Sequence, residues 1–282
     1  MTYRTPFMLL LVSLVVPVTV GAAAVSLPPI VVCYPGGPVN ENDAKGAMDA
    51  MLRVVERVGQ WQAKSLTSLF TSKVDQCKQL LADRNPSFAI VSLGQYLEQR
   101  TRHNLIPLVQ PKIKGRSSER YRVVVQKGKF NSLADLKGRS LGGTVLQEPE
   151  FIGKIVFAGA YDPRSFFTLK PSTQAIRALR SLDKGELDAV MLNEQQFSGL
   201  ASLALQNPLE AVFTSEEIPL MGMAADSKSS TAEDRARLTK ALEGMCTDVE
   251  GKKLCDLFGV EAFAAVKPVV FEPMVKLWSG GH

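Results

Sequence analysis

Polar side chains follow several short apolar runs that have the length and composition of buried strands. In open α/β sheets, ligands bind beyond the carboxyl ends of the strands, where side chains and the amides of helix N-termini converge. Hydroxyl, amide and guanidinium groups at such positions are typical of a site for a small polar or anionic solute. We therefore predict that ligand contacts come from Tyr34, Ser92, Gln95, Tyr96, Arg120, Thr144, Gln147, Ser172, Thr173 and Asn193.

Each of these residues also has a purely structural interpretation. Ser172 could serve only to cap the helix that follows it, and Tyr96 could be a core residue. Arg120 lies near a predicted crossing between two lobes, where it could pair with an anionic group.

Metal, nucleophilic and nucleotide chemistry are not indicated by the sequence. The chain has two histidines, His103 and His282, and neither has a partner at metal-ligand spacing. There is no nucleophile-elbow motif near His103. The glycine pairs at 36–37 and 142–143 match neither the dinucleotide fingerprint nor the phosphate-binding P-loop. We therefore predict no catalytic residue, no metal and no cofactor.

The charge is unevenly distributed along the 282-residue chain, which carries a net +5. Its 45% apolar and 22% charged residues suit one or two folded domains. The segment from Arg100 to Lys129 contains nine basic residues and a single acidic residue, Glu119. This run could be an ordinary solvated surface or a positive rim that attracts anions. Nucleic acid is not expected, because no aromatic platform alternates with these bases.

The N-terminus has the pattern of a secretory signal peptide over residues 1–24. Arg4 precedes an apolar run at 7–20, and small residues follow at 21–24, which favours cleavage after Ala23 or Ala24. An uncleaved anchor is the alternative, but the run is shorter than the roughly 20 residues that a span needs. No later segment is long enough to cross a bilayer. We expect a soluble periplasmic protein.

Four cysteines in an exported chain allow three disulfide pairings. Cys246 and Cys255 flank a predicted helix–turn–helix and could be joined. Cys77 lies on the apolar face of a helix that would cross over the strand containing Cys33, if the strand order is 2-1-3. We favour the pairs 246–255 and 33–77; four buried thiols are the alternative, which an oxidising compartment disfavours.

Strands and helices alternate in two series, which predicts βαβ units and parallel sheets. The first series has strands at 29–34, 64–70, 87–92 and 105–109, and helices at 40–58, at 72–82 and from Gly94. The second has strands at 121–125, from Arg139, and at 166–169, 187–193 and 209–213, with helices at 149–158, 172–182 and 194–205. A return strand at 218–224 and helices at 231–246 and 251–258 follow. We expect lobe 1 to comprise 25–117 and 216–282, and lobe 2, inserted, 118–215.

Four segments resemble the phosphate/phosphonate-binding branch of the type II periplasmic solute-binding proteins. FAIVSLGQYL at 88–97 resembles the family's strand and aromatic segment at the cleft, and SLADLKG at 132–138 its entry into the second lobe. The helix from Ser172 followed by GELDAV at 185–190, and the turn at 251–260, resemble two further family segments. The resemblance spans most of 28–265 and implies two α/β lobes with a central cleft, no enzymatic activity and an ABC permease as partner.

The chain departs from this family where a phosphoryl group would bind. The family has a serine- and threonine-rich loop after the lobe-two strand, whereas the loop at 144–149 supplies only the hydroxyl of Thr144, and Glu148 would repel an anion. Ser172-Thr173 stand where the family often has a histidine, and Asn193-Glu194 where it has an acid. The resemblance therefore leaves the ligand open.

The sequence as a whole predicts an exported, monomeric binding protein that captures a small polar or anionic solute for an ABC transporter. One alternative is a periplasmic sensor whose ligand-bound form docks on a signalling receptor. The other is a secreted enzyme, which would need an acid or base at the cleft floor, and Glu148 and Glu194 are the candidates for that role.

Overall fold

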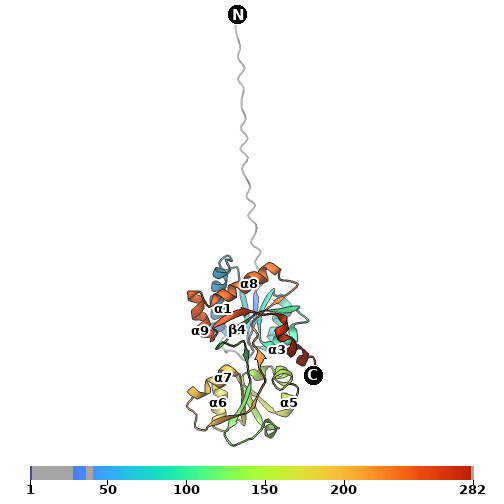
Figure 1. The fold of residues 1–282 in the computed structure, drawn as a ribbon, viewed down its shortest axis with the longest axis vertical. Coiled ribbons are helices and arrows are strands. Elements are labelled where there is room, and N and C mark those ends of the chain that lie inside the picture. Colours follow the sequence, from blue (N-terminus) through green and yellow to red (C-terminus); the bar gives the residue numbers. More distant parts are fainter. Residues whose placement is uncertain (2–27, 36–40, 281–282) are drawn as a thin grey trace.

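The structure is a computed structural model that describes residue 1 and residues 28–35 and 41–280. Two lobes lie one above the other, joined at a narrow waist (Figure 1). The upper lobe contains both the first and the last parts of the described chain, and the lower lobe contains its middle. Apart from Met1, the predicted signal peptide lies outside the described residues. None of the helices in the described ranges is long and apolar enough to cross a membrane.

Lobe 1 is built on a six-stranded sheet in the order β13-β4-β12-β3-β1-β2. Its strands are β1 (Ile30–Cys33), β2 (Ser68–Thr71), β3 (Phe88–Val91), β4 (Leu105–Lys112), β12 (Met223–Asp226) and β13 (Ala262–Ala265). β1 pairs in parallel with β2 and β3, whereas β12 runs antiparallel to β3 and β4. The sheet is therefore mixed and not wholly parallel as predicted, because β4 leads towards lobe 2 and β12 brings the chain back.

Helices cover both faces of this sheet: α1 (Glu41–Val58), α2 (Val74–Arg84), α3 (Leu93–Gln99), α8 (Ala232–Met245) and α9 (Val249–Phe258). The apolar face of α1 packs against α8 in one core cluster, through residues such as Met51, Val55 and Leu242. Both predicted disulfides are confirmed. Cys33–Cys77 joins β1 to α2, and Cys246–Cys255 joins the end of α8 to α9.

Lobe 2 has a five-stranded sheet in the order β10-β6-β9-β7-β8. Its strands are β6 (Arg122–Gln126), β7 (Ser140–Gly143), β8 (Thr168–Pro171), β9 (Ala189–Leu192) and β10 (Leu209–Thr214). The segment between β6 and β7 contains the 3-10 helix η1 (Leu133–Leu136), after which Gly138 takes φ +75°, a left-handed conformation that favours glycine. Helix α6 (Ala175–Asp183) buries Leu179 and Leu182 against the sheet.

Two predicted helices of lobe 2 differ in the structure. The helix predicted at 149–158 is a short α4 (Pro149–Phe151) that continues as a π-helix, η3 (Ile152–Val156). The helix predicted at 194–205 ends early, as α7 (Glu194–Ser198) followed by η4 (Leu200–Ser202). The remaining short helices of the lobe are η2 (Val145–Gln147) and α5 (Pro163–Phe166).

Two short strands connect the lobes. β5 (Ser118–Glu119) and β11 (Ile218–Pro219) pair with each other in antiparallel fashion as a separate two-stranded sheet. The predicted return strand at 218–224 is thus two strands, β11 and β12, with Gly222 between them. A Cβ on Gly222 would lie 2.7 Å from the carbonyl oxygen of Val109, so only glycine lets the returning chain approach β4 this closely.

The C-terminal segment contains elements that the sequence did not predict. β13 adds an edge strand beside β4, and after η5 (Pro268–Phe271) the helix α10 (Glu272–Trp278) packs on both α3 and η3. Lys154 Nζ lies 4.8 Å from the centre of the Trp278 ring. Because α3 belongs to lobe 1 and η3 to lobe 2, the end of the chain contacts both lobes beside the waist.

Candidate functional site

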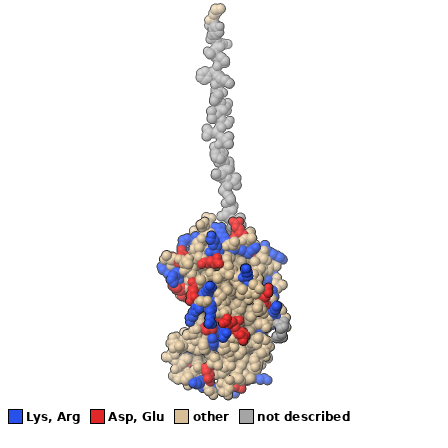
Figure 2. All heavy atoms as spheres, viewed as in Figure 1, with Lys and Arg blue, Asp and Glu red and all other residues tan. Residues whose placement is uncertain are grey.

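A cleft of about 960 Å³ lies between the two lobes. The segments that follow β1, β3, β7 and β9 line it, together with the two connecting strands and apolar residues of lobe 1. These are the carboxyl ends of parallel strands, where ligands bind in open α/β sheets. Figure 2 shows basic and acidic side chains together at the narrowing between the lobes.

Four of the ten residues predicted to contact ligand line this cleft: Tyr34, Ser92, Thr144 and Asn193. Each follows a different strand, two in lobe 1 and two in lobe 2. Tyr34 is 53% exposed, an unusual fraction for a large aromatic side chain, and is therefore accessible to a ligand.

The other six predicted residues lie elsewhere. Gln95 and Gln147 line a second cavity of about 800 Å³, which shares Gly94, Glu148 and Phe151 with the cleft. The remaining four, Tyr96, Arg120, Ser172 and Thr173, line neither cavity.

Each of those four has a local structural explanation. Tyr96 is buried, and the centre of its ring lies 5.6 Å from the centre of the Phe271 ring. Tyr96 is therefore a core residue. Arg120 lies 3.6 Å from the carboxylate of Glu217. The Ser172 hydroxyl donates to the carbonyl of Gln174 and accepts the N–H of the same residue. Ser172 and Thr173 follow β8, which is an edge strand and so lies away from the centre of the sheet.

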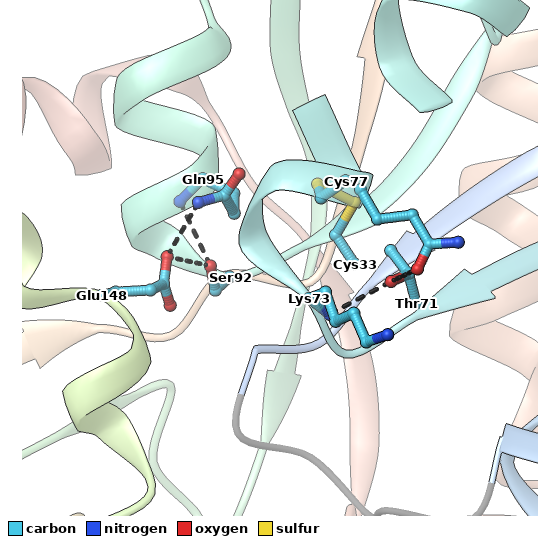
Figure 3. The surroundings of a disulfide bond; sticks show 8 residues. Cys33, Thr71, Lys73, Cys77, Ser92, Gln95 and Glu148 are labelled. Atoms are coloured by element: carbon cyan, nitrogen blue, oxygen red, sulfur yellow. Dashed lines mark hydrogen bonds between the residues drawn. A yellow bond between two sulfur atoms is a disulfide. The ribbon is translucent and has the colours of Figure 1, made fainter. Parts of the chain in front are cut away.

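Glu148 bridges the two lobes at the centre of the site. The Ser92 hydroxyl donates to Glu148 Oε1 at 2.8 Å, and Gln95 Nε2 donates to the same atom at 3.3 Å (Figure 3). The carboxylate lies over Gly94, where an added Cβ would come within 2.5 Å of Oε1. Burial raises the pKa of Glu148, and the hydrogen bonds from Ser92 and Gln95 partly oppose that rise.

A second carboxyl group, Glu119, enters the cleft from connecting strand β5. The Tyr121 hydroxyl donates to Glu119 Oε1 at 2.8 Å, and the backbone N–H of Glu194 donates to the same carboxyl group. Burial raises the pKa of Glu119 to about 7, despite the opposing effect of the hydrogen bond from Tyr121. Burial raises the pKa of Tyr121 far above its usual value, and the neighbouring Glu119 adds to that rise.

Glu194, a further carboxylate in the cleft, forms an ion pair with a neighbour. Arg122 Nη1 lies 2.9 Å from Glu194 Oε2, and the Arg122 guanidinium also stacks 4.4 Å from the centre of the Phe197 ring. In contrast, neither Glu119 nor Glu148 forms an ion pair with any basic residue in the part of the chain that the structure describes.

The hydroxyl of Thr144 is held by a neighbouring amide. Gln196 Nε2 donates to Thr144 Oγ1 at 2.9 Å, while the Asn193 side chain caps α7 by accepting the N–H of Gln196 at 2.9 Å. The only hydroxyl of the loop at 144–149 is thus fixed against α7. Gln196 was not among the predicted residues.

Glu119 and Tyr121 were also not among the residues predicted to contact ligand. The sequence contains one signal that could have found Glu119, because it is the single acid in the basic run between Arg100 and Lys129. Glu148 and Glu194 were considered only as repulsive or catalytic groups. Within the described ranges there is no cluster of three or more histidine, cysteine or acidic residues that could hold a metal ion.

Comparison with known proteins gives a family and a fold. Residues 49–270 match the family model described as "ABC transporter, phosphonate, periplasmic substrate-binding protein". None of the curated proteins compared with the chain matches it.

Solved structures of similar fold include a binding-protein component of an ABC phosphonate transporter from Pseudomonas aeruginosa, with a TM-score of 0.66 and 16% identity over 89% of this chain and 85% of that one. A Xanthomonas citri protein bound to ATP has a TM-score of 0.67 and 13% identity over 90% and 96% of the chains. PhnD1 from Prochlorococcus marinus, in complex with methylphosphonate, has a TM-score of 0.66 and 13% identity over 90% and 98%.

These identities are low enough that the neighbours establish only the fold, a two-lobed type II periplasmic-binding-protein fold. The family model covers most of the described chain, and its description gives a solute-binding role and a periplasmic location. The chain therefore belongs to the family of periplasmic substrate-binding proteins of phosphonate ABC transporters.

Proposed function

We propose that this protein captures a small organic solute in the cleft between its lobes and delivers it to an inner-membrane ABC permease. One observation carries the proposal: a cleft of about 960 Å³ is lined by strand ends of both lobes, and the lobes are connected by two short strands. A hinge at β5 and β11 would let the lobes close on a bound solute as rigid bodies. The bodies we propose are 25–117 with 216–282, and 118–215.

The solute that we propose differs from the ligand of the structural neighbour solved with methylphosphonate. In this chain the loop after β7 offers one hydroxyl, which already accepts a hydrogen bond from Gln196, and places the Glu148 carboxylate beside Ser92. A phosphonate would meet a negative charge where it needs hydrogen-bond donors.

Export through a cleaved signal peptide is part of the same proposal. The N-terminal pattern at 1–24 supports it, and the two disulfides suit the oxidising periplasm. N-terminal sequencing of the protein recovered from the periplasm should begin at Ala24 or Val25. Size-exclusion chromatography of this mature form should give a monomer. An intact N-terminus in the membrane fraction would contradict the export proposal.

The binding role is tested by thermal unfolding of the oxidised mature protein against a panel of small solutes. A ligand at 100 times its Kd adds about 2.7 kcal/mol to the free energy of unfolding and raises the Tm. Tyr34→Ala should weaken the effect of a true ligand, because this exposed ring lines the cleft. Thr173→Ala, outside both cavities, is the matched control. A solute that shifts both variants equally does not bind in the cleft.

A further inference from the structure

Four acidic residues line the cleft, Asp43 of α1 and three others. Glu119 comes from β5, Glu148 from the loop after β7, and Glu194 from the start of α7. Glu119 and Glu148 lie near Tyr121, whose hydroxyl donates a hydrogen bond to Glu119 and is within electrostatic reach of Glu148. The basic residues that line the cleft, Lys114 and Arg116, are exposed at its rim.

The position that an anionic group would need is filled by the protein itself. The Glu148 carboxylate accepts hydrogen bonds from the Ser92 hydroxyl and the Gln95 side-chain amide, and it lies over Gly94. A second negative charge placed beside this carboxylate would be repelled by it. This part of the cleft therefore excludes phosphonates and other anions.

Glu119 and Glu148 have no basic partner among the described residues. Glu194 has Arg122 at 2.9 Å, whereas hydroxyl and amide groups alone hold Glu119 and Glu148 among the described residues. Removing a carboxylate from water without a cation is costly, and a positive charge that enters the cleft would offset that cost. A cation that offsets this cost would lie between β5, which carries Glu119, and the loop after β7, which carries Glu148.

The remainder of the cleft is apolar and aromatic. The rings of Tyr34 and Tyr121 line it close to the carboxylates, and lobe 1 contributes Met48, Met51, Ile90 and Phe263. Aromatic faces attract organic cations, and apolar side chains accommodate a hydrocarbon body. A volume of about 960 Å³ is at the upper end of the usual range for small-molecule sites and has room for more than a charged headgroup.

We infer that the solute captured by this cleft is an organic cation, with a positively charged nitrogen placed between Glu119 and Glu148 and an apolar body against lobe 1. This inference rests on the proposed binding function and adds the class of the solute. It separates this chain from neighbours whose ligand is a phosphonate, since the charge that the site selects is reversed.

Isothermal titration calorimetry of the oxidised mature protein tests the inference with probes matched in shape and different in charge. Choline is compared with 3,3-dimethyl-1-butanol, and hexylamine with 1-hexanol; methylphosphonate and inorganic phosphate are the anionic probes. We expect at least one cation to bind at least tenfold more tightly than its neutral counterpart. Neither anion should bind.

Two variants locate the charge. Titrations are run at pH 8, above the pKa of about 7 of Glu119. Glu119→Gln and Glu148→Gln keep a hydrogen-bond acceptor at each position but remove the negative charge, and each should weaken binding of the cation about tenfold or more while leaving the neutral counterpart unaffected. Glu233→Gln, on the exposed first turn of α8, is the control and should bind like the unmodified protein. Unchanged thermal unfolding without ligand shows that each variant is folded.

The outcomes separate this inference from the proposed function. Binding of methylphosphonate, phosphate or a neutral probe in preference to the cations overturns the cationic solute and leaves the binding function intact. Cation binding that survives both glutamate substitutions also overturns it. If no probe of any charge binds or shifts the Tm, both the inference and the proposed function fail.

Discussion

The two lobes present different chemistry to the cleft and are stabilised in different ways. Lobe 1 contributes the Ser92 hydroxyl, the exposed charged residues Asp43, Lys114 and Arg116 and most of the apolar lining, and it contains both disulfides. Lobe 2 contributes the carboxylates of Glu148 and Glu194, and none of the four cysteines lies in it. Lobe 1 is thus covalently cross-linked, whereas lobe 2 is held by packing, hydrogen bonds and ion pairs without a disulfide.

This difference matters for a protein that closes around a solute. A cross-linked lobe keeps its half of the site in one geometry, whereas the other lobe moves as a packed unit on two strands. The two lobes also recognise each other without ligand, since donors of one face a carboxylate of the other. A solute must fit beside this contact or replace it.

The largest effect should follow removal of the Cys33–Cys77 bond, which closes a loop with a sequence separation of 44. The double variant Cys33→Ala/Cys77→Ala should lose about 4 kcal/mol of unfolding free energy, because the unfolded chain gains entropy. Urea unfolding measures the loss, and hydrogen exchange should show it in lobe 1. The pair Cys246→Ala/Cys255→Ala, with a separation of 9, should lose less. Equal loss of protection in both lobes would contradict the comparison.

Packing in lobe 2 is tested by Leu182→Ala in α6. Leu182 is fully buried between α6 and the lobe 2 sheet, in one core cluster with Leu179 and Val190, so its truncation should cost about 2–5 kcal/mol. The matched variant Leu242→Ala truncates an equally buried leucine of lobe 1. Hydrogen exchange should show loss of protection in lobe 2 for the first and in lobe 1 for the second. Exchange that rises throughout the molecule in either variant would mean that the lobes unfold as one unit.

The Glu119 carboxyl should make stability depend on pH. Its pKa is about 7 in the folded protein and near 4.3 when unfolded, so the folded state keeps a proton that the unfolded state loses. The unfolding free energy should therefore fall as pH rises from about 4.3 to 7. Glu119→Gln removes this term, and we expect the variant to match the unmodified protein at pH 4 and to be more stable at pH 8, by about 1–3 kcal/mol. Urea unfolding at both pH values measures the difference in unfolding free energy between the variant and the unmodified protein. An equal difference at pH 4 and pH 8 would contradict a raised pKa of Glu119.

The smallest effect should follow loss of the contact between the lobes. Glu148→Ala removes the hydrogen bonds to Ser92 and Gln95 at a cost of about 1 kcal/mol, and should open the waist. Small-angle scattering should show a larger radius of gyration, and exchange should rise at 92–95. Glu150→Ala is the control, since Glu150 pairs with Lys154 within lobe 2 at 2.8 Å. Identical scattering of the two variants would mean that Glu148 does not hold the lobes together.

Local pattern determined much of this protein. The apolar runs and helical periodicity predicted most strands and helices, because an element that buries one face needs apolar residues at regular spacing within a short stretch of sequence. The disulfide pairs followed from cysteine spacing and strand order. The rule that ligands bind at strand ends identified Tyr34, Ser92, Thr144 and Asn193, which line the cleft.

Tertiary structure decided the contacts between distant segments. Ser92 and Glu148 are 56 residues apart, and no local pattern predicts the hydrogen bond between this serine of lobe 1 and this carboxylate of lobe 2. β13 has an alanine-rich sequence of weak strand preference and forms only because β4 offers an edge. In the sequence, Glu119 is a single acid within a basic run. In the structure it lies on the connecting strand β5 and lines the cleft. The sequence located the cleft; the charge inside it depended on how the lobes meet.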